Sequence, residues 1–233
     1  MDSTFLHKLI DTYWKNTNPN GLKISAFILD DLCTDDEKRN IDYLWENTTA
    51  FDFLTFKYRE YDIKDRAKEI INWLGFPIDL GSVIPQIQLI EIVKEWRKHK
   101  GYEDLNIILT GDGADEFFGG YKRNIEYDSR WYDIFIELIY FHNLKLDQIS
   151  SKANIELRTP FQALPLLSFV LNLHYEARKN KRLFRELAKQ ICNFPDEVVS
   201  IKKHPLKVLP ENIIEYRKIL IKEFIKYVVH NQD

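Results

Sequence analysis

The sequence predicts an α/β protein with a parallel sheet covered by helices on both faces, followed by a mainly helical C-terminal part. Short apolar runs alternate with stretches of helical spacing up to about residue 125, as in sheets built from strand–helix–strand units. Beyond that point only the helical pattern recurs. A content of 45% hydrophobic residues over 233 residues supports a sizeable core. We therefore expect a nucleotide-binding α/β part at 1–125 and a helical part at 126–233.

Each element is expected from its local pattern. Residues 4–14 should form a helix because apolar residues recur every three or four positions, with Ser3 as its N-cap. Strands are expected where apolar and β-branched residues form short runs, and helices where an apolar stripe repeats. The expected strands are 23–29, 53–58 and 105–110. The further expected helices are 36–47, 62–74, 84–98, 131–141, 164–173, 182–192 and 213–229.

Composition and charge exclude several classes of protein. The net charge of −3 gives no electrostatic reason to expect a nucleic acid or an anionic membrane as partner. Cys33 and Cys192 are the two cysteines and lie far apart, which argues against a disulfide framework and is typical of a reducing cytosol. No apolar run approaches the roughly 18 residues of a membrane span. We expect a soluble cytoplasmic protein, and the pattern leaves its oligomeric state open.

The most informative stretch is 110–121 (TGDGADEFFGGY), which follows the expected strand 105–110. Its glycines allow close backbone approach to a ligand, and its carboxylates would need Mg²⁺ between them and a phosphate. Ligands of parallel sheets bind at the carboxyl ends of the strands, which is where this loop lies. The alternative is structural: Asp112 caps a helix, and Asp115 and Glu116 lie in its first turn. That alternative does not account for Gly119 and Gly120.

The same stretch resembles the segment Ser/Thr-Gly-Glu/Asp-Gly-x-Asp-Glu-x-Phe-Gly-Gly-Tyr of the asparagine synthetase family, in its synthetase domain. Three further stretches resemble that domain in the same order along the chain. They are 79–85 (DLGSVIP), 154–161 (NIELRTPF) and 194–203 (FPDEVVSIKK). The resemblance covers most of the chain and implies a nucleotide-binding fold of the pyrophosphatase type. It also implies an enzyme that adenylates a carboxylate with Mg-ATP, releases pyrophosphate, and lets an amine displace AMP.

The resemblance assigns roles to particular residues. Asp115 would hold Mg²⁺, and Thr110 and Gly111 would line the adenylate, with Glu116 also part of the nucleotide site. Asp112 matches the acid that accepts a proton from the attacking amine, a role in keeping with general base chemistry. Lys202 matches the lysine that neutralises phosphate charge during adenylation.

The start of the chain departs from the family pattern. A Ser-Gly-Gly-x-Asp-Ser loop after the first strand binds pyrophosphate in this fold, and Asp2 and Ser3 resemble its last two residues. Under this interpretation Asp2 binds Mg²⁺ and Ser3 binds the nucleotide. The strand and the Ser-Gly-Gly turn have no counterpart here, so we expect the chain to be a fragment, or an internal start, of a longer protein. A missing interior strand would leave two sheet edges unpaired.

Other departures concern the substrates. Gln162 and Ala163 stand where the family usually has Leu-Asp, which leaves aspartate or another small carboxylate open as the acceptor. The glutaminase domain is absent, so nitrogen would come from free ammonia, a substrate amine or a separate glutaminase. The competing hypothesis is a catalytically reduced, synthetase-like protein that serves as a binding or regulatory subunit. A nucleic-acid-binding module lacks the basic stripe that it would need.

Overall fold

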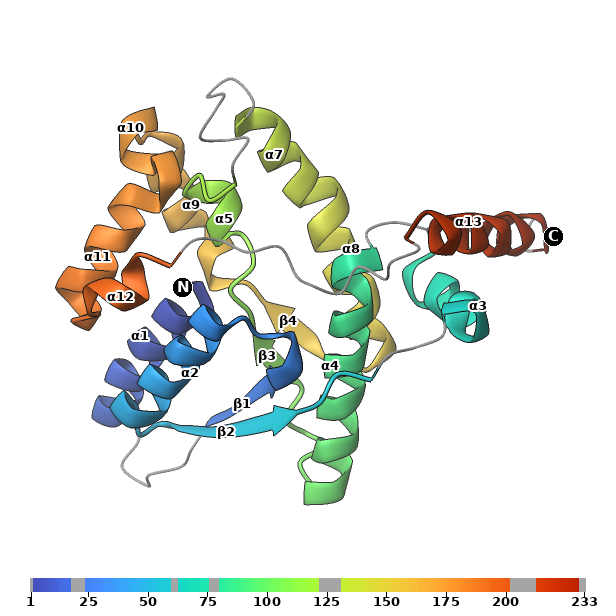
Figure 1. The fold of residues 1–233 in the computed structure, drawn as a ribbon, viewed down its shortest axis with the longest axis horizontal. Helices are drawn as coiled ribbons and strands as arrows, with labels where there is room; N and C mark the ends of the chain where they lie inside the picture. Colours follow the sequence, from blue (N-terminus) through green and yellow to red (C-terminus); the bar gives the residue numbers. More distant parts are fainter. Residues whose placement is uncertain are drawn as a thin grey trace.

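The computed structural model describes residues 2–17, 24–59, 63–75, 80–121, 131–201 and 213–230. These residues form an α/β protein in which four strands are outnumbered by helices (Figure 1). The strands are β1 (Ile24–Leu29), β2 (Phe51–Phe56), β3 (Ile107–Leu109) and β4 (Glu156–Arg158). The first-half helices are α1 (Asp2–Thr17), α2 (Asp35–Asn47), α3 (Ile63–Leu74), α4 (Leu80–Lys100) and α5 (Ala114–Phe117), with the 3₁₀ turn η1 (Asp30–Leu32).

The second half is helical apart from β4. Its helices are α7 (Trp131–Glu137), α8 (Leu144–Lys152), α9 (Leu164–Leu171), α10 (Tyr175–Arg178), α11 (Arg182–Cys192), α12 (Asp196–Val199) and α13 (Ile213–His230). A π-helical segment, η3 (Leu138–Asn143), joins α7 to α8, and two 3₁₀ turns complete the list, η4 (Pro160–Gln162) and η5 (Lys179–Lys181). None of the described helices is long and apolar enough to cross a membrane.

Strand β1 has helices on both of its faces, as predicted. It pairs in parallel with β2, with Ala26 opposite Phe53. Ala26 belongs to a cluster that includes Ile10 of α1, whereas the next residue, Phe27, points the other way and meets Trp96 of α4 at a ring distance of 5.3 Å. Successive side chains of a strand point to opposite faces, so α1 and α4 cover opposite sides of this sheet.

The strands do not form one sheet within the described residues, and this corrects the prediction. They form two two-stranded parallel sheets, β1–β2 and β3–β4. Strand β3 pairs with β4, in register from Ile107 opposite Glu156 to Leu109 opposite Arg158, and β4 comes from the part expected to be helical. A strand of three residues is too short to show an alternating pattern, so the sequence did not predict β4.

Three smaller predictions were also wrong. Helix α1 already includes Asp2, so Ser3 lies inside the helix and is not its N-cap. Helix α4 begins four residues before the predicted start at 84, so Pro85 lies within it. The helix expected at 131–141 ends at Glu137 and continues as the π-helical segment. Helix α11, in contrast, has the predicted bounds, 182–192.

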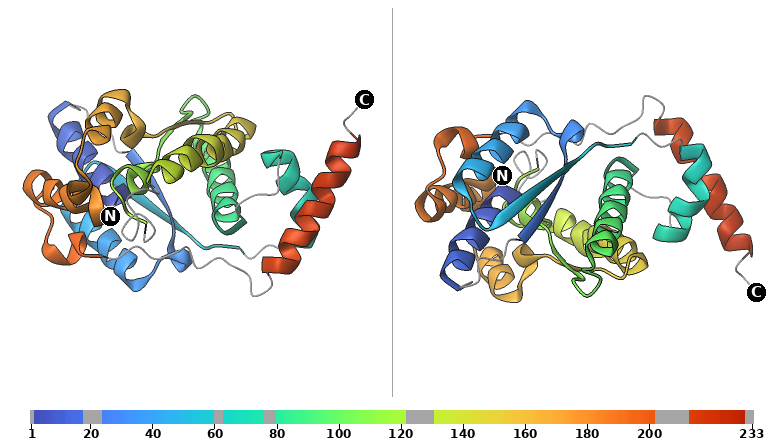
Figure 2. Two further views of the ribbon diagram at one scale, coloured as in Figure 1. Left: turned by 90° about the horizontal axis from the view of Figure 1, so that it is seen from above. Right: turned by 90° about the horizontal axis from the view of Figure 1, so that it is seen from below.

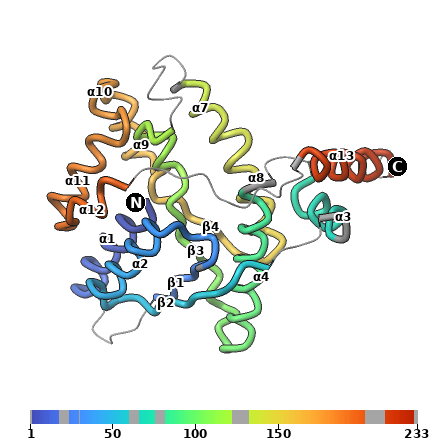
Figure 3. The backbone as a smooth tube through the Cα atoms, viewed as in Figure 1, coloured from blue at the N-terminus to red at the C-terminus, as the bar shows by residue number. Residues whose placement is uncertain are grey.

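The molecule has two main apolar clusters. One joins α3, α4, α8 and α13, with Ile108 and Leu157 of the β3–β4 sheet packed against it. The other joins α1, α5, α9 and α11. Helices α3 and α13 pack together at the end of the molecule that lies away from α1 (Figure 2). Helices α1 and α11 lie side by side although they are far apart in the sequence (Figure 3). The second cluster therefore brings the two halves of the chain together.

Asp11 fastens α1 to the loop before β2. Its side chain is 0% exposed and accepts hydrogen bonds from the backbone N–H groups of Thr49 and Ala50, both at 2.8 Å. Its second oxygen pairs with Lys15 at 2.8 Å. Burial alone would raise the pKa of Asp11, but these bonds and the Lys15 charge outweigh it and lower the pKa below its ordinary value.

Replacing Asp11 by Asn should therefore destabilise the protein. The substituted amide would place a donor where the structure needs an acceptor, so we expect the free energy of unfolding to fall by about 1–3 kcal/mol. Because the folded-state pKa of Asp11 is lowered, its stabilisation is present above a pH of about 4 and is lost as the pH falls through that pKa. Urea titrations at several pH values measure both effects.

The exposed Asp42 on α2 supplies the matched control. Asp42→Asn should change the unfolding free energy by no more than about 0.5 kcal/mol. Equal stability of the Asp11→Asn and Asp42→Asn proteins at neutral pH would contradict this account of Asp11.

Candidate functional site

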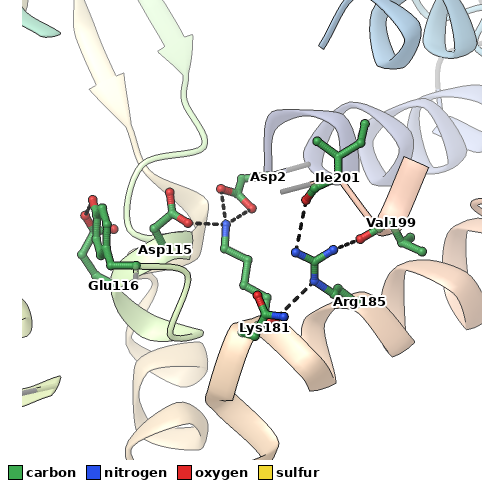
Figure 4. A network of polar contacts seen from close by, with 9 residues as sticks. Asp2, Asp115, Glu116, Lys181, Arg185, Val199 and Ile201 are labelled. Carbon is green, nitrogen blue, oxygen red and sulfur yellow. Dashed lines mark hydrogen bonds and ion pairs between the residues drawn. The ribbon is translucent and has the colours of Figure 1, made fainter. Parts of the chain in front are cut away.

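Three segments from distant parts of the sequence meet at one point. They are the start of α1, the loop that follows β3, and the turn from η5 into α11 (Figure 4). Phe184 of α11 packs beneath them, with its ring 4.7 Å from Phe5, 5.0 Å from Phe118 and 5.5 Å from Phe161. This aromatic cluster fixes how α1, the β3 loop and α11 lie relative to one another.

The centre of the site is the ammonium group of Lys181, which lies between the carboxylates of Asp2 and Asp115. Lys181 Nζ is 2.6 and 2.5 Å from the two oxygens of Asp2, and 2.5 Å from Oδ1 of Asp115. All three side chains are largely buried, with 8%, 19% and 15% of Lys181, Asp2 and Asp115 exposed. Burial disfavours the charged form of Lys181 and would lower its pKa. The negative charges of Asp2 and Asp115 outweigh this effect, so the pKa of the Lys181 ammonium is raised above its ordinary value. The structure thus brings the two predicted metal ligands together.

Two glycines of the loop allow close approach by neighbouring groups. A Cβ on Gly120 would overlap Oδ1 of Asp115 and Cε of Lys181. A Cβ on Gly111 would lie 3.1 Å from both the backbone nitrogen and Oγ of Ser3, which is tighter than an ordinary contact. The predicted nucleotide residues Ser3 and Gly111 are therefore neighbours, and the β3 loop lies directly against the N-terminus of α1.

Asp112 does not cap a helix. The N-cap of α5 is Gly113, in a left-handed conformation with φ of 96°, and no side chain caps the helix. The Asp112 carboxylate instead accepts a hydrogen bond from the hydroxyl of Thr110, and the N–H of Thr110 donates to the carbonyl of Arg158 at 3.0 Å. The capping alternative for Asp112 is thus wrong. Asp115 and Glu116 do lie in the first turn of α5, as that alternative expected.

Glu116 points away from the ammonium of Lys181 (Figure 4). It is 4% exposed and accepts a hydrogen bond from the hydroxyl of Tyr121 at 2.6 Å. The Glu116 carboxylate therefore lies on the other side of the loop from Asp115. Its hydrogen bond links α5 to Tyr121, the residue that follows Gly119 and Gly120.

Arg185 binds three backbone carbonyls beside the same site. Its guanidinium donates to the carbonyl of Asn180 at 3.0 Å, to that of Val199, and to that of Ile201 at 3.2 Å (Figure 4). Burial lowers the pKa of Arg185, and the charges of Asp2 and Asp115 act in the opposite direction. The predicted catalytic residue Lys202 lies outside the described residues, but it follows directly after Ile201. Arg185 thus holds the backbone at Val199 and Ile201 close to the start of α11.

Lys181 and Arg185 were not predicted from the sequence. The sequence does contain a signal that could have indicated them. The helix dipole disfavours two cations four residues apart at the start of a helix, so such a pair suggests partners elsewhere in the fold. The amphipathic pattern of 182–192 concealed it, because charged residues on such a helix usually face solvent.

The residues present are suited to a divalent cation shared with a phosphate. Two carboxylates already lie around one cation position, which the Lys181 ammonium takes, and they come from the start and the middle of the chain. Among the described residues no three acidic, histidine or cysteine side chains group to hold a metal. Mg²⁺ is commonly bound through one or two carboxylates, with substrate phosphates and waters as its other ligands. Asp2 and Asp115 meet that requirement.

The sequence is similar to that of a protein named as an asparagine synthetase. The chain is 28% identical over 135 residues to "Probable asparagine synthetase (glutamine-hydrolyzing)" of Acanthamoeba polyphaga mimivirus. The similar region covers 46% of this chain and 24% of that relative, so the chain spans about a quarter of the relative's length. No protein family model matches the chain.

The role of Arg185 can be tested by hydrogen exchange. The three bonds of Arg185 come from three different nitrogens, which the single nitrogen of a lysine cannot replace, so Arg185→Lys should lose hydrogen bonds worth about 1 kcal/mol each. We expect backbone amides at 198–201 to exchange roughly tenfold faster, as measured by mass spectrometry of peptides. The exposed Arg182, in the same helix, is the control. Unchanged exchange in Arg185→Lys, or an equal rise in Arg182→Lys, would refute the assignment.

Proposed function

We propose that this chain is the synthetase part of an ATP-dependent carboxylate–amine ligase of the asparagine synthetase type. The observation that carries the proposal is the convergence of Asp2 and Asp115 on one cation position, directly after a parallel strand. Acidic residues placed there suit a metal-bound polyphosphate, because they need a cation before a phosphate can approach. The similarity to a protein named as an asparagine synthetase supports the same reaction class.

The proposed fold is that of the pyrophosphatase-type nucleotide-binding proteins. Parallel strands, helices on both faces of β1 and a site at the carboxyl end of β3 all support it.

In the proposed reaction the acceptor carboxylate attacks the α-phosphorus of ATP, and pyrophosphate leaves. Ammonia or an amine then attacks the acyl carbon of the adenylate, and AMP leaves as the amide forms. Asp112 would take the proton that the attacking nitrogen loses, and the hydroxyl of Thr110 donates a hydrogen bond to its carboxylate. The bound Mg²⁺ would neutralise phosphate charge. Ser3, Gly111 and Glu116 remain proposed nucleotide residues, and Lys202 a proposed phosphate-neutralising residue.

The substrates beyond ATP are proposed by class. The acceptor is a small carboxylate such as aspartate, and the side chain of Gln162 lies against Gly113, beside Asp112. Gln162 and Asn143 hydrogen-bond to each other through both of their amide groups, at 2.8 and 3.0 Å. The loop beside Asp112 is thus lined by neutral amides. Nitrogen comes from ammonia or from a separate glutaminase, and the proposed location is the cytoplasm.

One observation favours a second function. The carboxylates of Asp2 and Asp115 are both paired with the ammonium of Lys181, as expected of a chain that no longer uses them to bind a metal. The chain would then be a catalytically reduced synthetase-like protein that acts as a binding or regulatory subunit. Titration calorimetry with Mg-ATP separates the two, because saturable binding contradicts the reduced form.

Substitution of the two loop aspartates tests the reaction. With Mg-ATP, ammonia and a panel of carboxylates that includes aspartate, Asp112→Asn should retain nucleotide binding and slow amide formation about 10²–10⁴-fold. Asp115→Asn should weaken Mg-ATP binding itself, because one of two metal ligands is lost. Pyrophosphate release and calorimetry measure these effects.

The exposed Asp104, in the turn before β3, is the control and should behave as the wild type. Saturable Mg-ATP binding that survives Asp115→Asn unchanged would remove the nucleotide site from this position.

A further inference from the structure

The backbone at Lys181 has an uncommon conformation, and its side chain is directed toward Asp2 and Asp115. Asn180 and Lys181 have φ of 53° and 57°, in the left-handed region that residues other than glycine rarely adopt. The N–H of Lys181 donates to the carbonyl of Phe118 at 2.9 Å, which ties this turn to the end of the β3 loop. Such strain persists where the surrounding structure holds it in place, and it is concentrated at functional sites.

The stem of Lys181 packs against a residue that has no side chain. Its Cε lies against Gly120, at a point that a Cβ would fill. Arg185 differs, because its guanidinium is committed to three backbone carbonyls. Of the two cations near the carboxylates, Lys181 is therefore the one that can leave without breaking the backbone contacts of α11.

The charges of the site cancel while Lys181 is in place. Asp2 and Asp115 carry two negative charges, and Lys181 with the adjacent Arg185 carries two positive ones. A bare divalent cation would have to displace a buried ammonium from three carboxylate oxygens and would leave that ammonium without a counter-charge. A metal that arrives with a nucleotide brings phosphate oxygens that can accept the ammonium instead.

We propose that Lys181 is an exchangeable internal cation that occupies the metal position when no nucleotide is bound. It excludes divalent metal that lacks a nucleotide, and it moves from the two carboxylates to the phosphates when the metal–nucleotide complex binds. Lys181 thus acts as a positioning residue that makes metal binding depend on nucleotide. This inference rests on the proposed function in one respect, namely that the site takes a metal–nucleotide complex.

The experiment measures Mn²⁺ binding in the absence of nucleotide, by the paramagnetic resonance signal of free Mn²⁺. Wild-type protein should bind Mn²⁺ weakly. Lys181→Met should bind it about tenfold more tightly or better, because two carboxylates then face each other without a counter-charge. Lys181→Gln, which keeps a hydrogen-bonding end, should show the same gain and serves if the methionine variant fails to fold. Lys189→Met, on the same helix and paired with Asp196 at the surface, should match the wild type.

A non-hydrolysable ATP analogue added to the wild type completes the test. Tight Mn²⁺ binding that appears with the analogue supports both proposals. If the analogue produces no tight Mn²⁺ binding, the proposed function is contradicted. The tighter Mn²⁺ binding of Lys181→Met and Lys181→Gln without nucleotide tests the exchange proposal separately. Tight Mn²⁺ binding by the wild type without nucleotide, or no gain in either lysine variant, overturns the exchange proposal.

Discussion

The ion cluster of Lys181 with Asp2 and Asp115 is the interaction on which the arrangement of the molecule depends. It joins the first helix to the loop after β3 and to the start of α11, across 179 residues of sequence between Asp2 and Lys181. Three charged groups in a poorly solvated position are costly unless each is paired, and here every charge has its opposite within contact distance. Removing Lys181 would leave two largely buried carboxylates without the ammonium that pairs with both.

Apolar packing makes that pairing possible. Phe184 lies one turn after Lys181 and contacts aromatic rings of α1, of the loop after α5 and of η4. These contacts place the three segments before any charge is considered, since packed aromatic side chains are held to defined geometries. The cluster of charges then lies at the edge of the aromatic cluster, where Gly111 and Gly120 let the backbones come close. Packing and charge thus act on the same three segments.

The sequence predicted the elements that have strong local patterns and not the contacts between them. Helix α11 has the expected bounds because its apolar stripe is regular, and β1 was placed to within a residue by its apolar run. Strand β4 was missed, because three residues carry no periodicity. Asp2 and Asp115 could be named from their resemblance to family segments. Lys181 could not, because its position depends on two left-handed residues and on partners far away in the sequence.

Lys181 lies directly before the first residue of α11 and Arg185 lies in the first turn of that helix, and this has a mechanical consequence. A single turn of α-helix is stiff, so a displacement of one of these residues along the axis is transmitted to the other. Lys181 contacts the carboxylates, and Arg185 contacts the carbonyls of Val199 and Ile201. A ligand that shifts the first turn of α11 therefore also shifts the segment that enters residue 202. The two sides of the site are linked through one rigid body, and a ligand bound on one side alters the geometry of the other.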